Sequence, residues 1–296
     1  MKSYPKISVI TPNYNGEKFL EDTILSVINQ GYPNLEYIVI DGGSSDSSVD
    51  IIKKYSHSIA YWVSEKDKGI AEALNKGFAK ATGEILAWLN SDDMYFCWTL
   101  RTVAEIFNAH LSLRWITGIP TVWNDRNVIT KTSHVKYNYF THVCYPFRCI
   151  QQESTFWKRS LWEEAGGYIN SGYNYMVDSE LWSRFFLLEK IYNVEALLGG
   201  FRNHSSSMSK VFANKCVAEH QNSAKLLKFS KQNDLSMVNK INKIILLNRN
   251  KFIRPFVKLF WRLLPDKNKA NFFCVIYSSG EWKLEERDFI NGNHYL

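Results

Sequence analysis

The sequence lacks long hydrophobic runs: no stretch of about eighteen uncharged apolar residues, the length that spans a bilayer, occurs in the 296-residue chain. The apolar stretch that follows the first six residues is too short for the core of a signal peptide. We therefore expect a cytoplasmic protein that neither crosses a membrane nor is secreted.

Cysteines are few, and their arrangement excludes two kinds of small cross-linked protein. They number five and include no CxxC pair: Cys97, Cys144, Cys149, Cys216 and Cys274. An odd count without close pairs suits neither a disulfide framework nor a zinc site. Reduced thiols, as are usual in the cytosol, are the expected state.

Two nucleotide-binding patterns are also missing. No GxGxxG follows the first expected strand, and GxxxxGK[ST] occurs nowhere. Dinucleotide dehydrogenases and P-loop NTPases are therefore disfavoured. An ordered globular protein is expected, because the composition is 45% hydrophobic and 15% aromatic.

The net charge of +7 is concentrated near the C-terminus. Residues 240–269 carry nine Lys or Arg against one acid, and the rest of the chain is nearly neutral. No nucleic-acid partner is expected, because a nucleic-acid binder would normally carry its basic surface on the working domain.

Within this basic window, residues 254–264 are predicted to form an amphipathic helix. Viewed along the helix axis, its basic side chains fall in a sector about 80° wide, and apolar side chains occupy most of the remaining circumference. Such a helix suits the surface of an anionic membrane. Packing on the catalytic domain or on a second subunit, in a homo-oligomer, would explain the pattern equally well.

The first ninety residues alternate between strand and helix patterns. Strands are predicted at 6–11, 35–40, 59–63 and 85–89, with helices at 18–30, from 47, and at 70–81. Strands separated by helices of this length pair in parallel through right-handed crossovers. The sequence predicts an α/β fold with a mostly parallel sheet.

The remainder of the chain is less regular. Helices are expected at 98–109 and 178–189, a short strand at 114–117, and an aromatic, irregular segment at 133–157. From about residue 210 the pattern is helical, polar and then basic. We divide the chain into residues 1–95, residues 96–210, and a helical, basic C-terminal extension, residues 211–296.

Polar and acidic residues follow all four predicted strands of the first half. They form the segments Thr11–Asn15, Asp41–Asp46, Glu65–Asp67 and Asp92–Asp93. The carboxyl ends of parallel strands meet at one edge of the sheet, where ligands bind. An acidic rim containing glycines suggests a metal-assisted nucleotide site.

Several ordered motifs resemble those of the family 2 glycosyltransferases, of the type that makes bacterial surface polysaccharides. They are TPNYNG (11–16), VIDGGSSD (39–46), SEKDKGIAEALNKG (64–77), ATGEILAWLNSDD (81–93), QQESTFWKRSLWEEAGGY (151–168), VDSELWSRF (177–185) and FRNHSSSMS (201–209). The resemblance covers roughly residues 6–210. It implies a GT-A fold and an inverting enzyme that uses nucleotide sugars. By the same resemblance, residues 1–95 would form the half of the domain that binds the nucleotide sugar, and residues 96–210 the half that binds the acceptor.

The resemblance implies a metal site at Asp92 and Asp93. Asp93 would ligate Mg²⁺ or Mn²⁺, hard ions that take carboxylate and phosphate oxygens together, and Asp92 would hold the ribose or a metal-bound water. His204, in an RxH element, would add a ligand, and Arg202 would offset phosphate charge. An Asx turn that caps the next helix is the plainer explanation for the two acids.

The nucleobase would be bound by residues at the first strand ends. By resemblance, Asp41 accepts the N3–H of uracil or thymine, while Thr11, Pro12 and Tyr14 form the pocket wall. Asp67 matches a family position near the base and sugar. The preceding residue, Lys66, stands where many relatives have proline, so the donor sugar is not implied.

The resemblance implies that Asp178 is the general base that takes the proton from the acceptor hydroxyl. Glu180 is assigned with Gln152 and Glu153 to sugar or acceptor binding. Residues two apart on a helix point to different faces, so Asp178 and Glu180 cannot both face the sugar. The alternative for both acids is stabilisation of the helix N-terminus through its dipole.

The sequence thus predicts a metal-dependent transferase that moves a sugar from UDP or dTDP to a hydroxyl of a glycan or lipid-linked acceptor, at the cytoplasmic face of a membrane. A sugar nucleotidyltransferase is a rival, although TPNYNGEK (11–18) lacks its usual loop of glycines and basic residues. The other rival is a non-catalytic glycan- or membrane-binding scaffold with the same fold.

Overall fold

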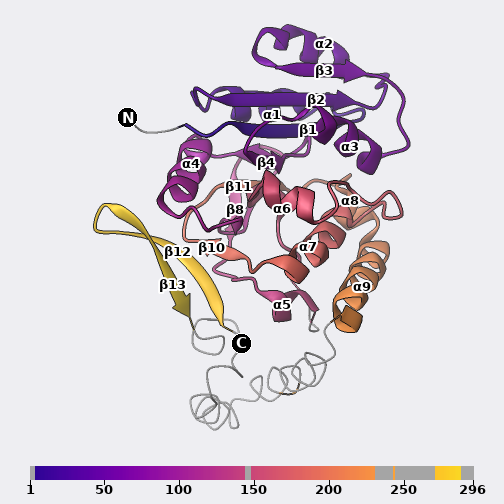
Figure 1. The fold of residues 1–296 in the computed structure, drawn as a ribbon. Coiled ribbons are helices and arrows are strands. Elements are labelled where there is room, and N and C mark those ends of the chain that lie inside the picture. The colour runs from indigo at the N-terminus through magenta and orange to yellow at the C-terminus, as the bar shows by residue number, and fades with distance from the viewer. Residues whose placement is uncertain (1–3, 144–147, 231–242, 244–270, 288–296) are drawn as a thin grey trace, which may run out of the picture.

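The computed structural model describes residues 4–143, 148–230, 243 and 271–287. Its centre is a nine-stranded sheet in the order β13-β12-β10-β6-β9-β4-β1-β2-β3, with helices on both faces (Figure 1). A second, four-stranded sheet has the order β5-β11-β7-β8. No helix in the described part of the chain is long and apolar enough to cross a membrane.

The first half forms the predicted parallel sheet. Strands β1 (Ile7–Asn13), β2 (Leu35–Asp41), β3 (Tyr61–Ser64) and β4 (Ile85–Trp88) pair in parallel. They are linked by helices α1 (Leu20–Ile28), α2 (Ser48–Lys54) and α3 (Ile70–Lys80), with a short 3₁₀ helix η1 (Ser56–Ser58). The central strands β1 and β4 are buried throughout, as expected for apolar runs covered on both faces.

The sheet continues through the second half of the fold. Its elements are α4 (Thr99–Ala109), β6 (Trp115–Thr117), α5 (Tyr139–Val143), the 3₁₀ helix η2 (Gln152–Ser154), β9 (Thr155–Lys158), α6 (Arg159–Glu164), α7 (Val177–Leu188) and β10 (Tyr192–Val194). Strand β9 is antiparallel to both β4 and β6, whereas β10 is parallel to β6. The chain thereby places η2 next to the end of β4.

Aromatic packing fixes α7 against the sheet. Trp182 of α7 is buried and stacks on Trp88 of β4, with ring centroids 5.8 Å apart and planes 8° apart. It also stacks on Trp115 and meets Trp157 edge to face. Offset-stacked and edge-to-face contacts are the favoured geometries of aromatic rings, so the start of α7 is held firmly relative to β4.

The small sheet brings three distant segments together. It consists of β5 (Met94–Tyr95), β7 (Thr121–Trp123), β8 (Ile129–Thr132) and β11 (Gly199–Arg202). A Cβ at Gly199 would lie 1.9 Å from the Glu153 carbonyl oxygen, so the close approach of β11 to η2 requires glycine there. The residues after β4, in η2 and after β11 therefore become neighbours.

The C-terminal region corrects one prediction, because it is not entirely helical. Helices α8 (Met208–Val211) and α9 (Ala213–Ser230) are followed by a hairpin of β12 (Phe272–Ser278) and β13 (Glu281–Arg287). Strand β12 pairs in parallel with β10 and extends the main sheet (Figure 1). Phe272, Cys274 and Val275 of this strand are buried, whereas Tyr277 near its end is exposed. The predicted helix at 254–264 lies outside the described residues.

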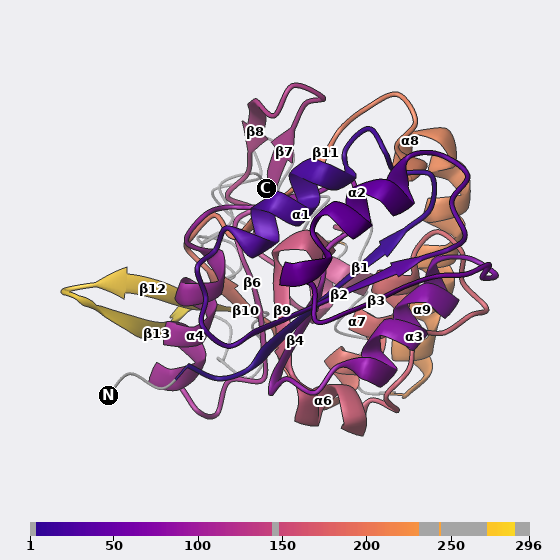
Figure 2. The ribbon, with the colours of Figure 1, turned by 90° about the horizontal axis from the view of Figure 1, so that it is seen from above.

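The view from above shows α9 and the β12–β13 hairpin at opposite sides of the molecule (Figure 2). The hairpin turns at Ser279 and Gly280, which have φ values of 56° and 86°. Two positive φ angles are typical of the tight turns that join antiparallel strands. The C-terminal region thus contributes both to the sheet edge and, through α9, to the surroundings of α7.

Candidate active site

The pocket wall predicted at the end of β1 has a buried part and an exposed part. Thr11 and Pro12 are buried within the strand, and the Thr11 hydroxyl accepts a hydrogen bond from Tyr37 at 3.0 Å. Tyr14 lies beyond the strand and is 68% exposed. The pocket wall predicted for these three residues stays a prediction, and only Tyr14 presents its ring to solvent.

Asp41 ends β2 and holds the adjoining turn. Its carboxylate accepts hydrogen bonds from the side chains of Asn13, Ser44 and Ser64 and from the amides of Gly43 and Ser44, at 2.5–3.2 Å. Burial alone would raise its pKa, but these donors lower it. The side chain has no exposed surface here, so its predicted contact with a base stays a prediction.

Asp67 lies directly against this turn. A Cβ at Gly42 would be 2.9 Å from Asp67 Oδ2, so only glycine leaves the carboxylate in place. The other oxygen of Asp67 accepts a hydrogen bond from the Gly69 amide at 2.8 Å. The ends of β2 and β3 thus form one continuous rim, as the sequence predicted.

The acidic pair follows β4, and its two members have different surroundings. Asp93 is fully buried and accepts hydrogen bonds from the Arg202 amide at 2.8 Å and the Gln152 side chain at 3.2 Å. Burial, followed by repulsion from Asp92 and Glu153, raises the Asp93 pKa well above its usual value. Asp92 is partly exposed.

His204 reaches Asp92 from the loop after β11. Its Nε2 lies 3.0 Å from Asp92 Oδ2, and its Nδ1 lies 2.9 Å from the Ser206 hydroxyl. The imidazole packs on the Phe19 ring, with centroids 4.8 Å apart. His204, which the resemblance assigns to the metal, therefore contacts the residue next to Asp93 in the chain.

Arg202 supports the acidic loop from within. Its Nε donates to the Asp92 carbonyl oxygen at 2.6 Å, and its Nη1 contacts Asn127 and lies 3.3 Å from Asp22. The side chain has no exposed surface. The phosphate contact predicted for it stays a prediction, and the observed role is to hold Asp92 and Asp93.

Glu153 and Gln152, in η2, lie between the acidic pair and α7. Glu153 is 3% exposed, and burial with repulsion from Asp178 and Asp92 raises its pKa to about 8. Among the described residues, neither Glu153 Oε1 nor Gln152 Oε1 has a hydrogen-bond partner. Unpaired buried oxygens of this kind are unfavourable until a cation or a donor reaches them.

Asp178 occupies the first turn of α7. Burial of its carboxyl group raises the pKa to about 6, with a further contribution from Glu219. Glu180, two residues on, forms an ion pair with Arg184 at 2.9 Å and is 2% exposed. The structure thus separates the two acids: Asp178 belongs to the acidic cluster, while Glu180 pairs within its own helix.

The structure therefore gathers Asp92, Asp93, Glu153 and Asp178 into one cluster, which we call the acidic cluster. Gly16 lies between this cluster and the turn at Asp41. A Cβ at Gly16 would come within 3.0 Å of Asn13, near the turn, and of Ser91, which precedes Asp92. Asn13 in turn donates to Asp41. The predicted rim is continuous from β1 to β4.

The donor atoms suit a hard divalent cation, but they are not gathered around one point. Carboxylates that raise one another's pKa and unpaired oxygens of Glu153 and Gln152 fit such an ion chemically. Within the described residues, no three His, Cys, Asp or Glu groups form a ready coordination sphere. Binding would require a small rotation of the side chains.

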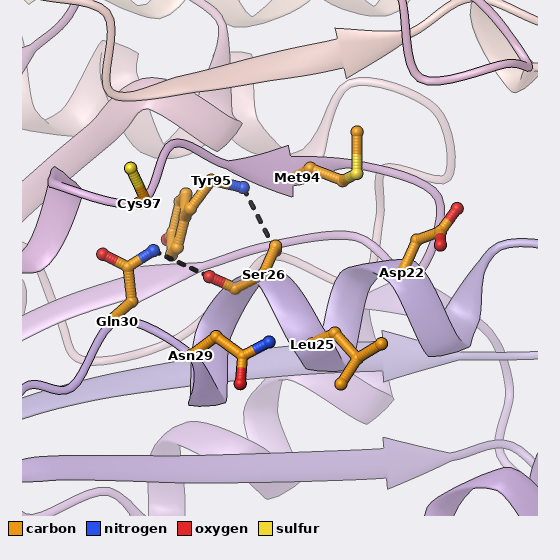
Figure 3. A pocket seen from close by; sticks show the side chains of 8 residues that line it. All are labelled: Asp22, Leu25, Ser26, Asn29, Gln30, Met94, Tyr95 and Cys97. Atoms are coloured by element: carbon orange, nitrogen blue, oxygen red, sulfur yellow. Dashed lines mark hydrogen bonds between the residues drawn. The ribbon is translucent and has the colours of Figure 1, made fainter.

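A surface hollow lies behind the acidic loop. It is lined by residues of α1 and of β5 and their neighbours: Asp22, Leu25, Ser26, Asn29, Gln30, Met94, Tyr95 and Cys97 (Figure 3). The Ser26 hydroxyl of α1 accepts a hydrogen bond from the Tyr95 amide of β5 at 3.2 Å, which links the two sides of the hollow. None of the predicted site residues lines this hollow, which is separate from the acidic cluster.

Sequence reasoning missed the residues that hold the site from outside the motifs. Thr23 of α1 donates to the Asp93 carbonyl oxygen at 2.8 Å, and Asp22 pairs with Arg202. Glu219 and His220 of α9 contact the start of α7. An amphipathic helix shows which face is buried, but the partner of a polar residue on that face depends on tertiary packing.

The fold and the acidic cluster define a nucleotide-sugar transferase architecture, and the comparisons with known proteins agree. Residues 8–187 match Glycosyl transferase family 2. The match covers more than half of the chain, which therefore belongs to this family. The predicted family, its α/β fold and the glycosyltransferase class are confirmed.

Curated relatives include the Bacillus subtilis glycosyltransferase TuaG, named for teichuronic acid biosynthesis, which is 39% identical over 31% of this chain and 37% of its own. An uncharacterized glycosyltransferase of Haemophilus influenzae is 26% identical over 81% of this chain and 77% of its own. The matches to TuaG and to two other curated relatives span 29–37% of their lengths.

Solved structures share the fold at low identity. Staphylococcus aureus TarS in complex with UDP-GlcNAc has a TM-score of 0.57 and 18% identity, with coverage of 90% of this chain and 83% of that one. A Pyrobaculum calidifontis mannosyltransferase in complex with GDP-Man and Mn²⁺ has a TM-score of 0.54 and 16% identity, with coverage of 87% and 84%. These similarities support the fold alone.

Proposed function

We propose that the chain transfers a sugar from a UDP- or dTDP-linked donor to a hydroxyl of a glycan or lipid-linked acceptor, with inversion, in surface polysaccharide synthesis. The observation that carries the proposal is the acidic cluster at the edge of a parallel sheet, in which the charge of Asp178 helps to raise the pKa of the buried Glu153. Family membership and relatives named for cell-wall glycans support it.

Asp178 would act as the general base. A carboxyl group with a pKa of about 6 is ionised at neutral pH, yet it is basic enough to take a proton from an attacking hydroxyl. In an inverting reaction one such group suffices, because the nucleotide diphosphate leaves from the opposite face of the sugar. The first turn of α7 would place Asp178 on the acceptor side.

Asp93 and His204 would hold Mg²⁺ or Mn²⁺, with Asp92 nearby for the ribose or a bound water. When bound, the ion would offset the charge of the leaving diphosphate. Neighbouring residues fix the two side chains that would bind the ion. The Arg202 amide and Gln152 donate hydrogen bonds to the Asp93 carboxylate, and the Phe19 ring packs on the imidazole of His204. Glu153 and Gln152 would then face the sugar.

Tyr14 and the turn at Asp41 would bind the pyrimidine base. The exposed Tyr14 ring offers a stacking face, and Asp67 closes the other side of the turn. The donors from Ser44 and Ser64 keep Asp41 ionised. A shift of the Ser44 side chain would leave Asp41 Oδ1 with one donor, Asn13, and a lone pair for the base N3–H.

The test compares wild type with Asp178→Asn in a screen of nucleotide sugars with Mn²⁺. Transfer or slow donor hydrolysis is expected in wild type, with a loss of about 10²–10⁴-fold in the variant and unchanged donor binding. Unchanged turnover in the variant would reject Asp178 as the base. Donor binding without any turnover in wild type would favour a non-catalytic scaffold.

We further propose that residues 240–269, which lie outside the described residues apart from residue 243, bind the anionic cytoplasmic face of a membrane. The concentration of nine basic residues there supports this. Sedimentation with phosphatidylglycerol vesicles should fall when Lys251, Arg254, Lys258 and Arg262 are replaced by Gln. Equal sedimentation of both proteins would contradict the proposal and favour contact with the catalytic domain or a second copy.

A further inference from the structure

Helix α9 follows the segment that matches the family and lies beside α7 (Figures 1 and 2). Its side chains make hydrogen bonds to the first turn of α7 and to the three residues before it. These hydrogen bonds do not involve the polar segments at the ends of β1–β4. They reach the residues on either side of Asp178 from α9, which lies later in the chain. Their geometry determines where the proposed base stands.

Glu219 of α9 holds the segment that leads into α7. Its carboxylate accepts hydrogen bonds from three consecutive backbone amides, those of Asn174, Tyr175 and Met176, at 2.8–3.2 Å. These amides belong to the three residues that lead into α7, the last of which, Met176, is at the N-cap position. Glu219 therefore fixes the backbone immediately before Asp178.

His220 holds the next residue after Asp178. Its Nδ1 lies 2.7 Å from the Ser179 hydroxyl, and its Nε2 lies 2.9 Å from the His142 carbonyl oxygen. Since a carbonyl only accepts, Nε2 carries the proton and Nδ1 accepts from Ser179. Burial lowers the His220 pKa, which keeps the ring neutral in this tautomer.

The bonds continue across the helix pair. Ser223, one turn further along α9, lies 2.9 Å from the Ser179 hydroxyl, and His142 Nε2 lies 2.9 Å from the Ser183 hydroxyl. Ser179 and Ser223 are buried. Buried polar groups that satisfy one another define a single arrangement more sharply than apolar packing does.

We propose that Glu219 and His220 are positioning residues that hold Asp178 at the acceptor side of the site by clamping α7 on both sides of it. The inference rests on the proposed function, because it assigns these two residues to that same base. It gives a role to a helix that lies outside residues 8–187 but holds the segment before α7. Glu219 touches no reacting group and acts only through α7.

The charged and titratable groups around Asp178 predict a second readout. Glu219 and Cys216 approach it from α9, Cys149 from the segment before η2, and Glu153 from η2. The negative charge of Glu219 raises the Asp178 pKa, so removing it should lower that pKa. Because the base must be ionised, the acidic limb of activity would move to lower pH.

The first experiment measures kcat, the donor KM and the pH profile of full-length Glu219→Ala, with Gln221→Ala on the exposed face of α9 as the matched control. We expect kcat to fall about 10- to 100-fold, with an unchanged donor KM and an acidic limb at lower pH. Glu219→Gln keeps one accepting oxygen, so its kcat should lie close to that of wild type. Because it lacks the charge, the acidic limb of its pH profile should still lie at lower pH than in wild type. The control should match wild type.

The second measurement does not require activity. Hydrogen exchange at the amides of residues 174–176 should be faster in Glu219→Ala and unchanged in Gln221→Ala, while UDP binding shows that both variants are folded. Unchanged exchange and unchanged kcat would overturn the proposed clamp and leave the transferase proposal standing. If wild type lacks turnover, the transferase proposal fails, and with it the positioning role, whatever the exchange result.

Discussion

His204 Nε2 lies 3.0 Å from Asp92 Oδ2, although the two residues are 112 positions apart in the chain. Strand β11 carries His204 to this place by pairing with β5, directly after the acidic loop. The contact joins the first half of the fold to the second. It also places the imidazole beside the acidic pair for which we propose a metal role.

His204→Ala should therefore weaken metal use. We expect the Mn²⁺ concentration for half-maximal activity to rise about 10- to 100-fold, because a ligand or its close support is lost. Mn²⁺ titrations of donor turnover and of thermal shift would measure this. The exposed His57 offers a control, and an equal effect of His57→Ala would contradict a specific role for His204.

Stability should fall as pH rises through the range in which the buried acids ionise. The pKa of Glu153 is about 8 in the folded protein and near 4.5 when unfolded, so the folded state binds more protons between these values. Wild type should thus lose stability from about pH 4.5 to 8, and Glu153→Gln should lose less. Thermal unfolding at several pH values, without metal, measures the slope. Parallel curves for both proteins would contradict the raised pKa.

Gly42→Ala should impair donor use more than stability. The new Cβ would stand 2.9 Å from Asp67 Oδ2 and push that carboxylate off the turn beside Asp41. We expect a donor KM raised about 10-fold, as follows from losing about 1.4 kcal/mol of binding, with kcat nearly unchanged. Steady-state kinetics would measure it. Gly172→Ala, in an exposed loop, serves as the control, and similar kinetics in both variants would argue against the turn as part of the donor site.

Trp182→Ala should destabilise the whole fold. Trp182 is 1% exposed and contacts Trp88, Trp115 and Trp157 through its ring. Truncating a buried aromatic side chain to alanine leaves a cavity and typically removes about 3–5 kcal/mol of unfolding free energy. Urea unfolding followed by fluorescence would measure the loss. Trp98→Ala, at a half-exposed tryptophan, should lose clearly less, and an equal loss would contradict the packing argument.

The C-terminal hairpin shows a signal that was present in the sequence but outweighed. FFCVIYS is a run of aromatic and β-branched residues, and Ser279-Gly280 supplies the turn before the alternating EWKLEER. These features predict a β-hairpin by the usual rules. The neighbouring basic, helical composition led to the expectation of helix throughout. Local pattern could not show that β12 pairs with β10, because the two strands are far apart in the chain.

The sequence by itself determined the alternating strands and helices of the first half, the polar residues at their ends and the family. These features depend on local periodicity and on short motifs, which residues express regardless of what surrounds them. Only the tertiary structure decided that Glu153 joins Asp92, Asp93 and Asp178, that Glu180 pairs with Arg184, and that Glu219 holds the segment before α7. Burial and pairing depend on which segments meet in space, and contacts between residues far apart in the chain leave no periodic trace in it.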